Sequence, residues 1–290
     1  MAAAGGLATL AGIAALCGAG PLDILLTNDD GATATGIRAL RAQLLAAGHR
    51  VTIAAPDHNA SGSSMSFTWG TVRVTRDPDD LAVFSVGASP ATAVVLAATA
   101  LYPPGRGPDL VISGINQGPN SGSVLMLSGT LGAALAATVL LVPPVPGLAV
   151  SAARLHPAEP VDSPANRAHF DAVGAHVVRL LEGTRGWFCR DGEVTRSRTV
   201  LNVNYPARAV SELRGTVLVR QGATSDLRIT FTATGGDEYR AQPARGHAAD
   251  RRDSDNQWLE QGYATVTPVS GELNDEDAPR TSLSRRLRRL

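Results

Sequence analysis

The first feature that could do chemistry is a pair of adjacent carboxylates, Asp29 and Asp30, in the segment TNDDG at 27–31. An apolar run at 22–27, typical of a buried strand, ends where they begin. Adjacent acids repel each other unless a positive charge lies between them, and a divalent cation such as Mg²⁺ supplies that charge. The alternative is plain turn chemistry, in which Asn or Asp bonds its own backbone and Gly31 adopts a positive φ.

Two further polar segments follow predicted strands, PDHNASGSS at 56–64 and SGINQGPN at 113–120. In doubly wound sheets, ligands bind outside the carboxyl ends of the strands, so these segments are expected at the same edge as Asp29 and Asp30. Oxygens of Ser61 and Asn116 would then complete a mixed oxygen shell around the cation. Taken singly, each segment is also compatible with an ordinary polar loop.

The segment Ser128–Gly129–Thr130 opens a predicted helix over 129–141. Unpaired backbone N–H groups and the helix dipole make such an N-terminus an anion site, and the glycine allows close approach of a phosphate. The alternative is a simple Ser or Thr N-cap. A cation site and an anion site on one edge together indicate phosphate chemistry.

The elements that must position these residues alternate between strands and helices. Apolar runs predict strands at 22–27, 50–56, 72–75, 81–86, 109–114 and 147–151, and helical patterns cover 35–48, 90–102 and 129–141. This alternation predicts an α/β, Rossmann-like, doubly wound and mainly parallel sheet. A helix over 163–183 and strands at 199–206, 216–221, 227–234 and 263–269 predict appended C-terminal β-structure. We expect an exposed loop at 244–257 and a basic amphipathic tail at 282–290.

Composition narrows the function classes. The 290 residues carry 26 basic and 26 acidic side chains, so neither nucleic acid nor a membrane is an expected partner. All the basic residues are arginine, and the absence of lysine excludes a Walker A loop, a Schiff-base enzyme and a receiver domain. The chain also lacks the Asp-x-Asp motif of haloacid-dehalogenase phosphatases and the G-x-S-x-G of serine hydrolases.

The chain ends and cysteines bear on location. Cys17 and Cys189 are too few for a disulfide framework or a zinc site, and the size of the chain requires no disulfide. Residues 1–20 are apolar and lack a basic n-region. We expect residues 1–21 to be an extension, 22–290 to form one domain with a β-rich region from about 199, and the enzyme to be cytoplasmic. Export, with residues 1–20 as a signal peptide, is the alternative.

Four segments, LLTNDDG, APDHNASGSS, SGINQGPN and SGTLGAA, occur in this order and resemble the SurE family of metal-dependent nucleotidases. The resemblance covers about residues 22–151, with weaker similarity at 201–204 and 262–268. It implies a SurE-like fold and a homodimer or tetramer. It also implies that Asp29, Asp30, Ser61 and Asn116 hold the metal, and that Asn120, Ser128, Gly129 and Thr130 bind the phosphate.

The function expected from the sequence is a metal-dependent phosphomonoesterase acting on nucleoside monophosphates, as a 5′/3′-nucleotidase, or on related small phosphates. Mg²⁺ or Mn²⁺ is the expected cation. Asp29 and Asp30 are the expected catalytic residues, with Asp29 orienting the attacking water, acting as its base or attacking phosphorus directly. His58 either protonates a leaving group or lies in a solvated loop, and the apolar segment 123–127 predicts an apolar approach for the substrate. A non-catalytic phosphate-binding protein is the alternative.

Overall fold

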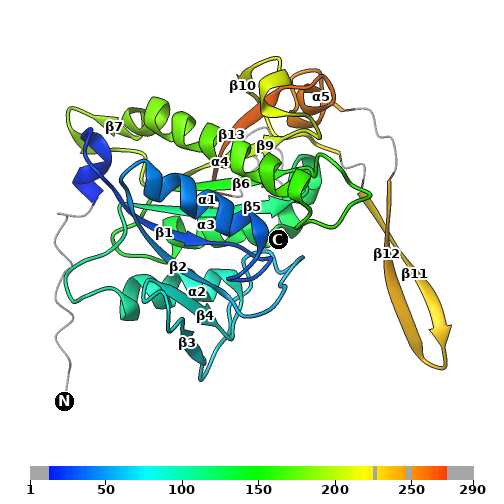
Figure 1. Cartoon of the computed structure of the whole chain (residues 1–290), viewed down its shortest axis with the longest axis horizontal. Coiled ribbons are helices and arrows are strands. Elements are labelled where there is room, and N and C mark those ends of the chain that lie inside the picture. The colour runs from blue at the N-terminus through cyan, green and yellow to red at the C-terminus, as the bar shows by residue number, and fades with distance from the viewer. Residues whose placement is uncertain (1–12, 225–226, 246–249, 273–290) are drawn as a thin grey trace, which may run out of the picture.

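The computed structural model describes residues 13–224, 227–245 and 250–272 (Figure 1). Its centre is a nine-stranded sheet in the order β10-β13-β9-β6-β5-β1-β2-β4-β3. All neighbouring strands are parallel except β3 beside β4 and β13 beside β9, which confirms the mainly parallel prediction. The strands are β1 (Asp23–Thr27), β2 (Arg50–Pro56), β3 (Val74–Arg76), β4 (Val83–Val86), β5 (Leu110–Gln117), β6 (Gly147–Ala152), β9 (Thr199–Tyr205), β10 (Thr216–Leu218) and β13 (Ala264–Ser270).

Helices cover both faces of this sheet. On one face, α1 (Thr35–Ala46) packs against α4 (Pro164–Thr184), and on the other, α2 (Pro90–Leu96) packs against α3 (Gly129–Val139). A short α5 (Asp255–Glu260) lies near β13. The smaller elements are η1 (Ile13–Cys17), η2 (Ala97–Leu101), η3 (Gly122–Leu127), η4 (Arg185–Phe188), η5 (Val210–Glu212), β7 (Cys189–Arg190) and β8 (Glu193–Val194).

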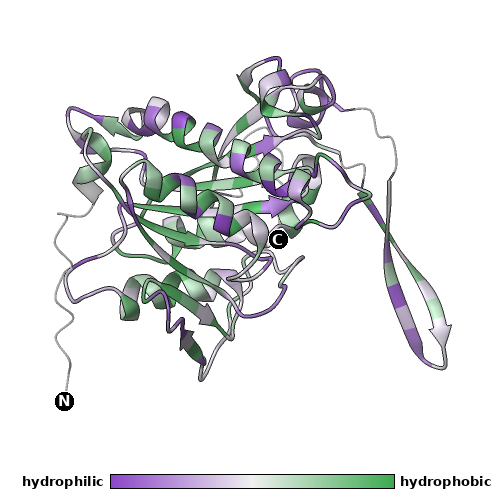
Figure 2. Ribbon diagram, viewed as in Figure 1, coloured by the Kyte–Doolittle hydropathy of each residue, from purple (hydrophilic) through white to green (hydrophobic). Residues whose placement is uncertain are grey.

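Strand β1 shows why the central strands read as continuous apolar runs. Ile24 and Leu26 are fully buried on the α1 and α4 side, whereas Leu25 is fully buried on the α2 and α3 side. A strand covered on both faces buries every side chain, each contributing about 1.5–3 kcal/mol. Figure 2 shows the central strands coloured largely as hydrophobic, as this burial on both faces requires.

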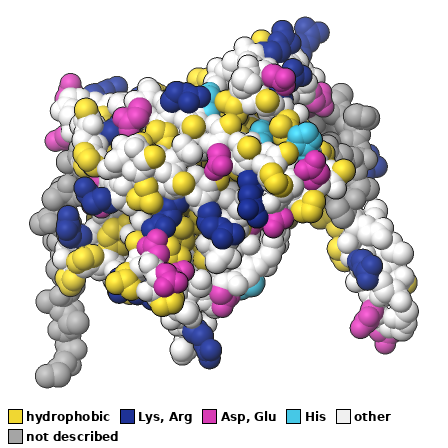
Figure 3. Space-filling model, in the orientation of Figure 1, with side chains coloured by type: hydrophobic (Ala, Val, Ile, Leu, Met, Phe, Trp, Pro, Cys, Tyr) yellow, Lys and Arg dark blue, Asp and Glu magenta, His cyan; other side chains and the backbone are white. Residues whose placement is uncertain are grey.

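A two-stranded hairpin, β11 (Leu227–Gly235) with β12 (Glu238–Arg245), projects away from the rest of the fold (Figures 1 and 3). Ile229, Phe231 and Tyr239 on it are exposed, and the Phe231 side chain keeps 67% of its surface accessible. The strand prediction at 227–234 is confirmed, but β12 was not predicted. On the face of the body seen in Figure 3, basic and acidic side chains are interspersed, as the neutral composition suggests.

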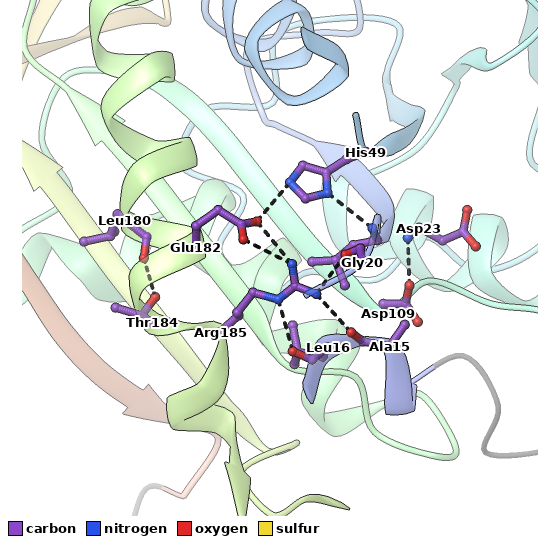
Figure 4. Close-up of polar contacts among 11 residues, drawn as sticks. Ala15, Leu16, Gly20, Asp23, His49, Asp109, Leu180, Glu182, Thr184 and Arg185 are labelled. Atoms are coloured by element: carbon purple, nitrogen blue, oxygen red, sulfur yellow. Dashed lines mark hydrogen bonds and ion pairs between the residues drawn. The ribbon is translucent and has the colours of Figure 1, made fainter. Parts of the chain in front are cut away.

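Residues 15–17 are part of the packed fold, contrary to the expectation that the fold begins near Leu22. Leu16 is fully buried, and Cys17 forms a disulfide with Cys189. The buried Arg185 guanidinium donates hydrogen bonds to the carbonyl oxygens of Ala15 (3.0 Å), Leu16 (3.3 Å) and Gly20 (2.9 Å), as Figure 4 shows. This bridge was not predicted, because two cysteines 172 residues apart leave no spacing pattern to read, and a single bridge is not the disulfide framework that the sequence excludes.

Two other expectations change, and a third lies outside the described residues. The loop expected at 244–257 includes the start of α5, and Ser254 and Asp255 within it are fully buried. The strand expected at 216–221 ends at Leu218. Residues 1–12 and the tail at 282–290 lie outside the described residues. Within the described part of the chain, no helix is long and apolar enough to cross a membrane.

Candidate active site

The two carboxylates lie at the carboxyl end of β1, where the chain leaves the core. Asp29 is almost completely buried, at 3% exposure, and its Oδ1 accepts a 2.7 Å hydrogen bond from the Thr130 hydroxyl. The Oδ2 of Asp30 accepts a 3.2 Å bond from the backbone N–H of Gln117 at the end of β5. The pair therefore connects the end of β1 to the end of β5 and to the start of α3.

Burial makes both carboxylates costly to ionise. It raises the pKa of Asp29, although the Thr130 hydroxyl counteracts part of this effect. The pKa of Asp30 rises to about 7, first because of burial and second because of the charge on Asp29. Among the described residues, no arginine or histidine forms an ion pair with either side chain. The site thus concentrates negative charge without a protein cation to balance it.

The N-terminus of α3 faces Asp29. The backbone N–H groups of Gly129 and Thr130 stabilise its ionised carboxylate and so offset a small part of the rise in its pKa that burial causes. A Cβ on Gly129 would lie 2.6 Å from Ser63 Oγ and 2.8 Å from Asp29 Oδ2, so only glycine fits there. Ser128 Oγ accepts a bond from the Leu131 backbone N–H at 3.0 Å, which makes Ser128 the N-cap of α3. Ser128 is therefore a simple N-cap, which was one of the two interpretations of this segment. The backbone N–H groups of Gly129 and Thr130, which the sequence predicts to bind a phosphate, face the Asp29 carboxylate in this structure.

The second segment, after β2, reaches the same place. The backbone N–H of Ala60 donates to the Asp29 carbonyl oxygen at 2.7 Å. Beside it, Ser61, Ser63 and His58 contribute to the lining of a cavity of about 400 Å³. Ser61 is exposed, whereas Ser63 Oγ is buried without a hydrogen-bond partner. His58 Nδ1 lies 2.7 Å from the Asp57 carboxylate and its side chain is 58% exposed, as expected for a solvated loop histidine.

The third segment is partly strand. β5 continues to Gln117, so Asn116 is on the strand and not in the predicted loop. The Asn116 Nδ2 donates to the Gly118 carbonyl at 2.8 Å, which leaves Oδ1 as the atom for a ligand. Gly36 of α1 lies so close to this strand that a Cβ there would be 2.0 Å from the Ile115 carbonyl oxygen. This contact explains the glycine at the start of α1.

Asn120 joins the third segment to α3. It is 7% exposed, and its Nδ2 donates to Thr130 Oγ1 at 3.3 Å and to Ser151 Oγ at 2.9 Å. Since Thr130 in turn donates to Asp29, a hydrogen-bonded chain runs from Asn120 through Thr130 to Asp29. A second, larger groove of about 800 Å³ begins at Ser128, and Leu125 and Met126 are among its lining residues.

The structure brings all the predicted site segments to one edge of the sheet, as the sequence predicts. Asp29, Thr130 and Asn120 are joined directly, while Asp30, Ser61 and Asn116 are adjacent to that chain through their neighbours. Sequence reasoning missed Asn28, whose Oδ1 accepts the Gly31 N–H at 3.2 Å and whose Nδ2 is buried without a partner. It also missed Ser63. Both lie inside the segments already singled out, but only burial distinguishes them from their neighbours.

The donor set suits a hard cation. Two carboxylates, the Ser61 hydroxyl and the Asn116 amide offer only oxygen, which Mg²⁺ and Mn²⁺ prefer over the nitrogen and sulfur ligands of zinc. Within the residues that the structure describes, no group of three or more His, Cys, Asp and Glu is placed to hold a metal. Asp29 and Asp30 have no protein counter-ion, which suits a bound cation. The unpartnered polar atoms of Asn28 and Ser63 beside them suit a polar ligand on that cation.

Comparisons with known proteins give the family of the chain. The family model described as survival protein SurE matches residues 24–226. The chain belongs to the SurE family. It is 34% identical over 257 residues to the 5′/3′-nucleotidase SurE of Yersinia enterocolitica, covering 87% of this chain and 92% of that protein. It is 35% identical over 269 residues to the 5′-nucleotidase SurE of Solidesulfovibrio magneticus, covering 91% of this chain and 97% of that protein.

A solved structure supports the same assignment. The crystal structure of the SurE protein from Aquifex aeolicus aligns with a TM-score of 0.71 at 28% identity, over 91% of this chain and 99% of that one. The SurE match begins in β1 and ends just before the projecting hairpin. The matched region therefore contains each of the site segments described above.

Proposed function

We propose that this chain is a metal-dependent phosphomonoesterase that hydrolyses nucleoside monophosphates and releases inorganic phosphate. The observation that carries the proposal is the buried pair Asp29 and Asp30 beside the N-terminus of α3, joined through Thr130 to Asn120. The SurE relatives named as 5′/3′-nucleotidase and 5′-nucleotidase support the substrate class. A non-catalytic phosphate-binding protein is not favoured, because every expected ligand residue is present.

In this proposal Asp29, Asp30, Ser61 and Asn116 hold the cation, Mg²⁺ or Mn²⁺. When bound, a divalent cation offsets the charge of the phosphoryl oxygens and makes a water more acidic. Asn120, Ser128, Gly129 and Thr130 are the proposed phosphate-binding residues. The Asn120 amide and the Thr130 hydroxyl already donate to Thr130, Ser151 and Asp29, so they would have to exchange these bonds for the phosphate. The unpartnered Asn28 Nδ2 and Ser63 Oγ are hydrogen-bond donors that remain free for it.

Asp29 is the residue that handles the proton of the attacking water. Its Oδ1 is held by Thr130, so the side chain has one fixed orientation. Burial raises its pKa, which makes the carboxylate a stronger base than an exposed aspartate. The Thr130 hydroxyl thus orients the base and lies within reach of Asn120, the proposed phosphate ligand. Asp30 contributes charge at the cation site.

The leaving group lies toward the groove of about 800 Å³ beyond Ser128. Leu125, Met126 and Leu131 contribute apolar surface there, and Gln221 and Asp253 contribute polar groups. This mixture suits a nucleoside, which combines an apolar base face with hydroxyl groups. Phosphate release from 5′- and 3′-nucleoside monophosphates, compared with p-nitrophenyl phosphate, tests the substrate class. Equal kcat/KM for the nucleotides and the aryl ester would contradict a nucleoside subsite.

A homodimer or tetramer is part of the proposal. The hairpin β11–β12 exposes Ile229, Phe231 and Tyr239, and such a surface favours contact with another copy. Truncating the chain before Arg240 is unsuitable as a test, because it would also remove β13, which lies between β10 and β9 in the main sheet. Replacing residues 227–245 with a short Gly-Ser linker leaves β13 in place. Light scattering should show an assembly for the full chain and a smaller one for this variant, and a full-length monomer at micromolar concentration would contradict the proposal.

Localisation is also a proposal. The sequence favours the cytoplasm. The Cys17–Cys189 disulfide is typical of oxidising compartments, but it is incompatible with cleavage after residue 20. Removal of residues 1–20 as a signal peptide would also remove Cys17 and the buried Leu16. The mass of the purified chain distinguishes an exported protein from a cytoplasmic one, because cleavage after residue 20 leaves a chain with Cys189 alone, whereas the cytoplasmic protein keeps both cysteines.

A further inference from the structure

Two asparagines of β9, Asn202 and Asn204, are fully buried and direct their side chains onto a single residue of the site. The Asn204 Oδ1 accepts a 2.7 Å hydrogen bond from the Asn120 backbone N–H. The Nδ2 groups of Asn204 and Asn202 donate to the Asn120 carbonyl oxygen at 3.1 and 3.0 Å. Both backbone polar groups of Asn120 are therefore held by side chains that are more than 80 residues away in sequence.

This arrangement fixes more than the backbone. With its peptide groups held, Asn120 directs its Nδ2 to Ser151 Oγ on β6 and to Thr130 Oγ1 on α3. Ser151 and Asn204 are aligned partners in the β6–β9 ladder, so the sheet sets the distance between these two supports. The Thr130 hydroxyl then orients the Asp29 carboxylate.

The packing of the sheet alone does not explain these asparagines. The aligned residues of β6 opposite Asn202 and Asn204 are Ala149 and Ser151, and all four are fully buried. Apolar side chains would fill such positions at lower cost, because a buried amide must find a partner for each polar atom. The Oδ1 of Asn202 has none. Polar groups kept at a cost in a buried strand indicate a role in the site they contact.

We infer that Asn202 and Asn204 are positioning residues that hold Asn120 in register with Thr130 and Asp29. The inference rests on the proposed phosphatase function. They touch neither substrate nor cation in this account, and they act only through Asn120. Because a displacement of about 1 Å in an active site can cost about 100-fold in rate, loss of these contacts should reduce turnover without loss of the fold.

The test is a double-mutant cycle. Asn204→Leu and Asn202→Leu keep the side-chain volume and remove the hydrogen bonds to Asn120. Each should lower kcat/KM for p-nitrophenyl phosphate, by roughly 10- to 100-fold for Asn204→Leu. In an Asn120→Ala background, where the side chain that reaches Thr130 is already missing, Asn204→Leu should change kcat/KM by less than about threefold. A purely structural role would instead make the two losses multiply.

The matched control is Thr265→Val. Thr265 is fully buried on β13 directly opposite Asn204, and its hydroxyl has no hydrogen-bond partner. This variant should keep wild-type kcat/KM. If a leucine variant fails to fold, as judged by circular dichroism, Asn204→Ser removes the same contacts with a smaller side chain and replaces it.

The outcomes separate the two levels of the account. The positioning role alone would be overturned in either of two cases, provided that the wild-type protein is active. In the first, the Asn202 and Asn204 variants keep wild-type kcat/KM. In the second, their losses multiply with the loss caused by Asn120→Ala. No phosphate release by the wild-type protein from any ester would overturn the proposed function and the positioning role with it.

Discussion

Replacing Asp30 with asparagine should stabilise the metal-free protein. The pKa of Asp30 is raised from 3.8 to about 7 by burial and by the neighbouring Asp29 charge. At about 1.4 kcal/mol per pKa unit, keeping this group ionised costs the folded state about 4 kcal/mol above pH 7. The substituted amide carries no charge but accepts the Gln117 N–H less strongly, so we expect a gain of about 2–4 kcal/mol at pH 8.

The sign of the pH dependence follows from the direction of the shift. Because the folded-state pKa lies above the unfolded value, the folded wild type retains its proton while the unfolded chain loses one. Wild-type stability should therefore fall between about pH 4 and pH 7, and the advantage of Asp30→Asn should appear over the same interval.

The assay is urea denaturation with a chelator present, at several pH values. Asp171→Asn, at an exposed position on α4, is the control and should differ little from the wild type. Saturating Mg²⁺ should remove most of this difference, because ligand at about 100 times its dissociation constant stabilises the wild type by about 2.7 kcal/mol and the variant has lost one ligand. An Asp30→Asn protein less stable than the wild type at pH 8 without metal would refute the reasoning.

Three further predictions concern the site and the disulfide. Thr130→Val should lower kcat as well as raise KM, because the Thr130 hydroxyl contacts both Asp29 and Asn120. Thr130→Ser should restore most of both parameters, and a change in KM alone would contradict this prediction. Inorganic phosphate should bind measurably by calorimetry only when Mg²⁺ or Mn²⁺ is present. Without a cation, the negative Asp29 carboxylate faces the same N–H groups at the start of α3 and repels the anion. Equal phosphate affinity in the presence of a chelator would contradict this prediction. Cys17→Ser should lower the free energy of unfolding by about 2–5 kcal/mol, because the bridge closes a long loop, and an unchanged denaturation midpoint in oxidising buffer would contradict it.

Much of the fold could be predicted because local signals agree with the final packing. The run 22–27 is apolar at consecutive positions because β1 is covered on both faces. Ser89 caps α2 and Pro90 begins it, as the Ser-Pro pair indicates. Polar segments at the ends of parallel strands must meet at one edge, so the site could be located from strand order alone.

The remaining features depend on contacts that the sequence pattern does not record. β12 contains Pro243 and lacks a clear alternation, and it is recognisable only by its pairing with β11. Asn202 and Asn204 alternate with apolar residues, which normally marks a solvent-facing side, yet both are buried. The Cys17–Cys189 bridge forms because the chain that follows α4 packs beside the segment that contains Cys17, and the sequence pattern does not show this contact.

The most direct measurement of the central claim is phosphate release from a nucleoside 5′-monophosphate by chelator-treated protein, titrated with Mg²⁺ and with Mn²⁺. The wild-type protein should be inactive without a divalent cation and regain saturable activity with either one. Asp29→Asn should remain inactive at every concentration while keeping its circular dichroism spectrum. Undiminished turnover in excess chelator, or wild-type turnover by a folded Asp29→Asn protein, would contradict the proposed metal-dependent phosphatase.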